Sequence, residues 1–346
     1  MSRPTAIDLF AGAGGATQGL KDAGLSVVGA IEKDSDAATS YRRNHPFTHL
    51  WEQDIVKLPA SVIRRTLKLE KGELTLLKAC PPCQGFSTLA EGRVPADDSR
   101  NDLVGHTVRF VREFRPRFVM LENVPGLARD RRATALTNAL QNLGYATRAY
   151  NVDARDFGVP QRRKRIILVS IRGLRNNKYL PISLVPIGIP GTTVRQALGE
   201  LQQVAPAEDS LNVHRTPTRL VDLRIRAIPI NGNRRDLPSE LQLACHIKID
   251  ATSRSAAASY GRLKLDDVAP TMTTRCTTPA CGSFIHPTEP RGITLREASW
   301  LQTFPISYIF EGAYGSIERQ IGNAVPPRMV QLIVRGILNA GQSANG

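Results

Sequence analysis

Short apolar runs alternate with polar, glycine-containing segments through the first half of the chain. Apolar runs of strand length lie at 5–10, 27–31, 74–77, 118–121 and 166–169. Segments that predict helices lie between them, at 16–23, 106–112 and 131–144. Near-continuous apolar strands are typical of parallel sheets that are covered on both faces by helices. The pattern therefore predicts an α/β fold built on a mostly parallel sheet.

The regular alternation stops near Arg172. From there to about Pro290 the chain consists of short mixed segments rich in Pro, Thr and Arg, which indicates a smaller domain. Further on, Thr294 and Glu297 form a capping-box pattern that predicts a helix to about Thr303. We therefore expect three parts: a large domain at 1–172, a smaller one at 173–310, and a returning C-terminal segment at 311–346.

The C-terminal segment predicts one more helix. Pro327 suits a first helical position, and Met329, Ile333 and Ile337 then fall on one face. The first strand begins only a few residues from Met1, so the chain provides little structure before it. We expect this last helix to supply the layer that would otherwise precede that strand.

Composition and charge narrow the class of protein. With 346 residues, 41% hydrophobic and 22% charged, the chain has the composition of a globular protein with a large core. The net charge of +15 and the pI of about 10.1 favour a polyanionic partner. Nucleic acid is the first candidate, and a ribosome-like or membrane-surface protein is the alternative.

The same data bear on the compartment. No apolar run approaches membrane-spanning length and the N-terminus has no signal-peptide pattern, so we expect no membrane partner and a cytoplasmic protein. The 5 cysteines form no spaced framework, which agrees with a reducing compartment.

The segment 79–87, Ala-Cys-Pro-Pro-Cys-Gln-Gly-Phe-Ser, follows an apolar run and falls in a loop at the carboxyl end of a strand. Open α/β sheets place their chemistry there. Two prolines make a stiff turn that can present Cys83 as a nucleophile. A buried structural cysteine is the simpler alternative. Cys80 and Cys83 could also form half a zinc site or a redox pair, but no second pair lies at ligand spacing and the Pro-Pro insert is stiff.

A glycine-rich turn, Gly12 to Gly15, follows the first strand. It departs from the phosphate-binding fingerprint because Thr17 occupies the third glycine position. Glu32 ends the second strand, where a carboxylate can accept hydrogen bonds from ribose hydroxyls. Asp54 follows at the next strand end. A tight structural turn and two solvated loop acids are the alternative interpretation.

Taken together, several motifs occur in one order: D-L-F-A-G-x-G-G, P-P-C-Q-G-F-S, E-N-V, Q-x-R-x-R and T-x-R-E-x-x-x-L-Q-x-F-P. This series resembles the cytosine-C5 DNA methyltransferases and covers most of the chain. The resemblance implies a Rossmann-like S-adenosylmethionine-dependent catalytic domain at 1–172 and a smaller, mixed target-recognition domain at 173–310. The chain departs from the family at Cys80, where glycine is more common, and we expect Cys80 to be a bystander.

The resemblance also implies catalytic roles. Cys83 would add to C6 of the target cytosine, while Glu122 would stabilise a proton at N3. A carboxylic acid in an apolar site can have its pKa raised enough for that role. Arg163 and Arg165 would help to hold the cytosine ring. No metal is expected.

The remaining implied contacts fall into two sets. The S-adenosylmethionine site would comprise Phe10, Gly12, Ala13, Gly14, Gly15, Glu32, Asp54, Ile55, Pro82, Leu103 and Asn323. Contacts to double-stranded DNA would come from Gln84, Ser87, Gln161, Arg262, Thr273, Thr274 and Arg275. Further plausible DNA contacts are Arg219, Arg224, Arg226, Arg234 and Arg235.

Alternatives and partners complete the prediction. An RNA cytosine methyltransferase of the same fold would share every catalytic residue, although the size of the region from 172 to 290 favours DNA. A DNA-binding protein that has lost catalysis is the second alternative, and a nicotinamide oxidoreductase is a distant third. We expect a monomer, nucleoid-associated if the source is prokaryotic, and a cognate restriction endonuclease as a functional, not physical, partner.

Overall fold

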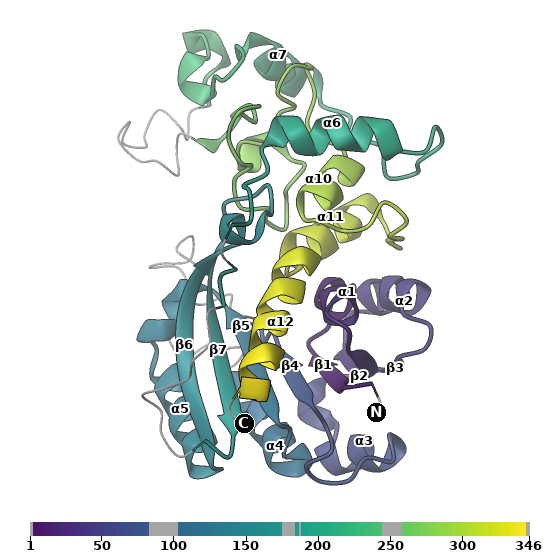
Figure 1. Cartoon of the computed structure of the whole chain (residues 1–346). Coiled ribbons are helices and arrows are strands. Elements are labelled where there is room, and N and C mark those ends of the chain that lie inside the picture. The colour runs from purple at the N-terminus through teal and green to yellow at the C-terminus, as the bar shows by residue number, and fades with distance from the viewer. Residues whose placement is uncertain (1–2, 83–102, 175–183, 187, 244–257, 344–346) are drawn as a thin grey trace. The chain divides into compact units, whose positions relative to one another are not determined.

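The computed structural model describes residues 3–82, 103–174, 184–186, 188–243 and 258–343 (Figure 1). Its contacts divide the chain into two compact units. We call them the large unit, which comprises 1–157, 164–189 and 325–346, and the small unit, which comprises 158–163 and 190–324. These contact units do not coincide with the three predicted functional domains, whose bounds stay a prediction.

The large unit contains a sheet with strand order β3-β2-β1-β4-β5-β7-β6. The strands are β1 (Thr5–Leu9), β2 (Ser26–Glu32), β3 (His49–Glu52), β4 (Leu76–Ala79), β5 (Phe118–Asn123), β6 (Tyr145–Asp153) and β7 (Lys164–Arg172). Strands β1 to β5 run parallel, as the apolar pattern predicts. β7 runs antiparallel to both β5 and β6. The sequence pattern did not predict β6 or this reversal.

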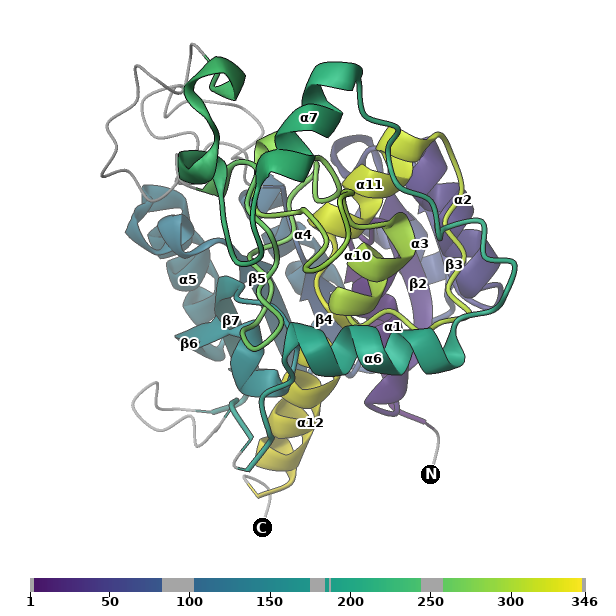
Figure 2. The same cartoon turned by 90° about the horizontal axis from the view of Figure 1, so that it is seen from above.

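Helices cover both faces of this sheet. Ile7 and Leu9 of β1 point into a core that contains residues from α3 (Ala60–Thr66), α4 (Leu103–Phe114) and α5 (Arg131–Asn142). Because side chains alternate along a strand, the neighbouring Asp8 points to the opposite face. That face carries α1 (Gly15–Asp22), α2 (Ser35–Asn44) and α12 (Pro327–Ser343) (Figures 1 and 2).

α12 packs directly against α1, as predicted for the C-terminal helix. A Cβ built on Gly19 would lie 2.7 Å from the Val330 Cβ, so only glycine allows this close approach. Gln331 and Arg335 donate hydrogen bonds to the carbonyl of Asp22, which ends α1. The apolar face of α12 is fully buried, through Met329, Ile333 and Ile337 among others. The last helix thus completes the layer over β1.

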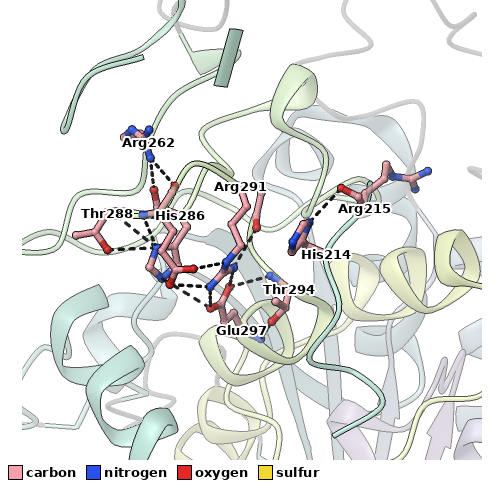
Figure 3. A network of polar contacts seen from close by, with 10 residues as sticks. His214, Arg215, Arg262, His286, Thr288, Arg291, Thr294 and Glu297 are labelled. Carbon is pink, nitrogen blue, oxygen red and sulfur yellow. Dashed lines mark hydrogen bonds and ion pairs between the residues drawn. The ribbon is translucent and has the colours of Figure 1, made fainter. Parts of the chain in front are cut away.

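The described part of the small unit has little regular sheet. The helices in that part are α6 (Val194–Val204), α7 (Arg219–Ala227), α10 (Leu295–Leu301) and α11 (Tyr314–Asn323). The predicted capping box is confirmed, because the Thr294 hydroxyl accepts from the Glu297 N–H at 3.0 Å and the Glu297 carboxylate accepts from the Thr294 N–H at 2.8 Å. Figure 3 shows that Glu297 also pairs with Arg291. The cap of α10 therefore belongs to a larger polar network.

Candidate functional site

The glycine-rich turn between β1 and α1 has an unusual backbone. Phe10, Gly12 and Gly14 all have positive φ, at 59°, 57° and 94°. Hydrogen bonds fix this conformation: the Ala11 N–H donates to the Ile31 carbonyl at 3.0 Å, and the Gly14 N–H donates to the Ala11 carbonyl at 3.0 Å. Positive φ is unstrained only for glycine, which explains why Gly12 and Gly14 occupy two of these three positions.

Glu32, at the end of β2, is bound to this turn. One carboxylate oxygen accepts from the Gly12 N–H at 2.8 Å, and the other accepts from the N–H groups of Lys33 and Asp34 at 2.8 Å each. Burial raises the pKa of Glu32, and these hydrogen bonds oppose that rise. An ionised carboxylate can accept about four hydrogen bonds, so the three observed leave room for one more donor.

Asp54 lies just beyond the next parallel strand, β3, and one of its carboxylate oxygens accepts from the Val56 N–H at 2.9 Å. Its other oxygen lies 3.8 Å from the Lys33 ammonium. Ile55 is buried in the core over α3 to α5, and Leu103 packs against the same core. The glycine turn, Glu32 and Asp54 therefore lie at the carboxyl ends of the adjacent strands β1, β2 and β3, whereas Leu103 begins α4.

Glu122 is the second-last residue of β5, at the same edge of the sheet, and is 3% exposed. One carboxylate oxygen lies 2.8 Å from the Arg165 Nε, near the start of β7. Because β7 is antiparallel to β5, its first residues lie beside the last residues of β5. This reversal brings together two residues that the sequence places on separate strands.

Cys80 contacts the other oxygen of Glu122. Its Sγ lies 2.7 Å from the Glu122 Oε2 and acts as the donor. Burial, and then the charge of Glu122, raise the pKa of the Cys80 thiol well above its ordinary value, which keeps it protonated. Cys80 therefore contacts the predicted catalytic acid, and the expectation that its thiol takes no part in the reaction stays a prediction. No sequence signal marked this contact, because 42 residues separate the two partners.

A buried ion pair under this edge was also missed. The Lys78 Nζ donates to an oxygen of Asp8 at 2.8 Å, and the two side chains are 1% and 0% exposed. The hydroxyl of Thr17 donates to the other oxygen of Asp8 at 2.7 Å and lies 3.0 Å from the Tyr41 hydroxyl. This network joins the strand before the Cys-Pro-Pro segment to the strand before the glycine turn.

Three predicted residues, Cys83, Gln84 and Ser87, lie outside the described residues. Two others, Gln161 and Arg163, are buried in the small unit. Arg163 donates to the carbonyls of Met272 and Gly322 at 3.0 and 3.3 Å. The Gln161 side chain accepts from the Met272 N–H at 2.9 Å. Within the small unit, these two side chains brace the segment that contains the predicted DNA contacts.

That segment runs past the end of α11. Thr274 and Arg275 are exposed, and Thr273 is half-buried. A Cβ on Gly322 would overlap the Thr273 carbonyl and lie 2.8 Å from the Thr274 N, so glycine is required there. Asn323, the next residue of α11, is exposed.

The predicted DNA-binding arginines differ in environment. Arg262 is 7% exposed, and its guanidinium donates to the backbone carbonyl of Ile228. It also donates to the backbone carbonyl of His286 (Figure 3). This favours a structural role. Arg224 and Arg234 are also buried. The predicted arginines that are exposed are Arg219, Arg226, Arg235 and Arg275.

Among the described residues, no cluster of His, Cys, Asp or Glu could hold a metal ion. No helix in that part of the chain has the length and apolar character needed to cross a membrane.

The chain resembles known proteins along almost its whole length. Residues 5–339 match the family model described as C-5 cytosine-specific DNA methylase. A Type II methylase from Herpetosiphon aurantiacus, M.HgiDII, is 33% identical, with 96% of this chain and 94% of the relative covered. The Type II methyltransferase M.XorII from Xanthomonas oryzae is 31% identical, with 98% and 86% covered.

The similar solved structures are also methyltransferases. A putative DNA modification methyltransferase encoded within an E. coli prophage has a TM-score of 0.70 at 28% identity, with 98% of this chain and 99% of that chain covered. The Dnmt2 methyltransferase of S. pombe has a TM-score of 0.66 at 16% identity, with 98% of this chain and 99% of that chain covered. At this identity the similarity is one of fold.

Proposed function

Because the chain belongs to the C-5 cytosine-specific DNA methylase family, we propose that its site methylates C5 of a flipped cytosine in a specific duplex DNA sequence through an adduct with Cys83. Membership of this family identifies the protein as a DNA cytosine-5 methyltransferase. The observation that best supports our residue assignment is the buried Glu122–Arg165 pair, which lies at the same sheet edge as the glycine turn and Glu32.

The proposed mechanism follows from the low nucleophilicity of cytosine C5. The Cys83 thiolate adds to C6 while Glu122 holds a proton at N3, which makes C5 enamine-like. C5 then takes the methyl group, loses its proton, and the Cys83 bond breaks to restore the ring. Arg165 orients the Glu122 carboxyl group, and Cys80 holds its second oxygen. A base inside a duplex cannot be reached in this way and must be flipped out of the stack.

S-adenosylmethionine, when bound, supplies the methyl group. The residues of the large unit suit this ligand. The Glu32 carboxylate can accept one more hydrogen bond, which a ribose hydroxyl could donate. A Cβ built on Gly12 would meet no atom within 4 Å, so the space next to Gly12 is open. The turn lacks the phosphate-binding pattern, which agrees with a ligand without phosphate. Within the large unit, Asp54, Ile55, Pro82 and Leu103 complete the proposed site.

The small unit is the proposed DNA-reading part. Its exposed arginines and threonines suit contacts to phosphates and base edges, and the net charge of +15 favours a polyanion. The named relatives are Type II methyltransferases. We therefore infer that a cognate restriction endonuclease is a functional partner. We also propose that the enzyme is monomeric and cytoplasmic.

A duplex with 5-fluorocytosine at the target position tests the mechanism. Addition and methyl transfer can both occur, but fluorine cannot leave as a cation, so the adduct persists through denaturing electrophoresis. Trapping should require S-adenosylmethionine and vanish in Cys83→Ala. Cys80→Ala keeps the nucleophile, so its adduct should still form, at a rate that reports the loss of the Cys80–Glu122 contact. An adduct that survives in Cys83→Ala would contradict the assignment. Preferential trapping of the same sequence as RNA would move the substrate to RNA.

A further inference from the structure

His45 is a buried residue that no motif singled out. It follows α2, its side chain is 1% exposed, and its ring lies edge-on to Tyr41 with ring centroids 4.8 Å apart. Its Nε2 lies 3.2 Å from the carbonyl oxygen of Gly14, in the glycine turn. Its Nδ1 lies 3.0 Å from the Nζ of Lys21, in α1. The imidazole thus links α2, α1 and the turn.

The two partners determine the form of the ring. A carbonyl can only accept a hydrogen bond, so Nε2 must carry a proton and donate to Gly14. An ammonium can only donate, so Nδ1 must be unprotonated and accept from Lys21. Burial, and then the charge of Lys21, lower the pKa of His45 to about 3, which agrees with a neutral ring. The contacts therefore select a single tautomer.

The bond to Gly14 acts at the junction between the turn and α1. Gly14 has φ of 94° and is the N-cap of α1, and no side chain caps this helix. Its carbonyl also accepts from the Gln18 N–H at 2.9 Å, in the first turn of α1. Two donors on one carbonyl fix the orientation of this peptide group, and with it the last residue of the turn.

We propose that His45 is a positioning residue for S-adenosylmethionine, which holds the glycine turn in its binding conformation through the Gly14 carbonyl. The inference rests on the proposed function, because it takes the turn to be the cofactor site. A loop that is already ordered loses less conformational entropy when its ligand binds. Loss of the His45 bond should therefore weaken cofactor binding without touching the reacting atoms.

The test compares three variants of the full-length protein by calorimetry with S-adenosylmethionine. His45→Leu removes the donor and should raise the Kd about fivefold, the factor that corresponds to about 1 kcal/mol. In His45→Gln, the amide can still donate to Gly14, and the Kd should stay within about twofold of wild type. His49→Leu is the matched control, because His49 is an exposed histidine of the same unit.

Steady-state kinetics provide a second readout. His45→Leu should raise the KM for S-adenosylmethionine and leave kcat and the KM for DNA nearly unchanged. Equal losses in His45→Leu and His45→Gln would overturn the proposal, since ring packing and not the N–H would then matter. An unchanged Kd in His45→Leu would overturn it as well.

A third measurement separates this proposal from the proposed function. Long-range ¹H–¹⁵N spectra of histidine-labelled protein should show His45 as the neutral Nε2–H tautomer at pH 7. An Nδ1–H or a doubly protonated ring would overturn the inference. A folded wild-type protein with this tautomer that does not bind S-adenosylmethionine would instead refute the proposed function.

Discussion

Replacement of Lys78 by methionine tests the buried ion pair between β4 and β1. The Lys78 Nζ lies 2.8 Å from Asp8, both side chains are at most 1% exposed, and the two residues are direct neighbours in the β1–β4 register. Lys78→Met would leave the Asp8 carboxylate buried without its cationic partner. The neutral hydroxyl of Thr17 would still donate a hydrogen bond to it. Removal of one partner of a buried pair costs about 3–5 kcal/mol. That is a large part of the roughly 5–15 kcal/mol that stabilises a typical domain.

The double variant Lys78→Met/Asp8→Asn separates the cost of an unpaired charge from the cost of lost packing. It removes both charges and keeps an acceptor for Thr17, so its free energy of unfolding should lie within about 1–2 kcal/mol of wild type. The coupling energy between the two sites should therefore be at least about 2 kcal/mol.

Urea denaturation followed by tryptophan fluorescence measures these energies. The chain has 2 tryptophans, Trp51 in the large unit and Trp300 in the small unit. In a Trp300→Phe background, fluorescence reports the large unit alone. A cost of less than about 1 kcal/mol for Lys78→Met, or strict additivity in the double variant, would refute the reasoning about the pair.

The pair also predicts a dependence of stability on pH. Burial by itself lowers the pKa of Lys78, but the charge of Asp8 and their hydrogen bond raise it above its ordinary value. A raised lysine pKa means that the folded state holds its proton more tightly than the unfolded state. The stabilisation that the Lys78–Asp8 pair contributes is therefore fully present below about pH 10, the ordinary pKa of a lysine in an unfolded chain. It is lost as the pH rises through the pKa of Lys78 in the folded state.

Two further predictions concern the ligands. Glu32→Ala should weaken S-adenosylmethionine binding in calorimetry by more than Asp54→Ala, because Glu32 is the more buried acid and also holds the glycine turn. DNA binding should survive in both, and unchanged cofactor affinity in both would contradict the cofactor placement. DNA affinity should fall steeply with salt, with log K linear in log salt, because the chain carries a net charge of +15. A flat response would argue against many phosphate contacts.

Local patterns were enough to predict much of the large unit. Apolar runs marked β1, β2, β4, β5 and β7, although their ends differ by a few residues. Capping and periodicity found α10 and α12, including the buried face of α12. These features depend on neighbours within about one turn of helix or a few residues of strand, so the sequence carries them directly. The edge strand β6 has exposed positions and no continuous apolar run, and it was missed.

The motif order identified the family and the types of residue at the site, but not their contacts. Glu32 and Glu122 were found because each ends an apolar run. The sequence by itself could not pair Cys80 with Glu122 or Lys78 with Asp8, because the partners lie 42 and 70 residues apart. It also missed His45, a single residue without a motif.

Tertiary structure decided how the strands are arranged, and the site depends on that arrangement. In a parallel strand, the functional residue lies at the carboxyl end, which a sequence pattern can locate. β7 runs the other way, so its first residues, not its last, reach that edge and place Arg165 2.8 Å from Glu122. Strand direction is set by long-range pairing and by the connections between strands, and an apolar run reads the same in either direction.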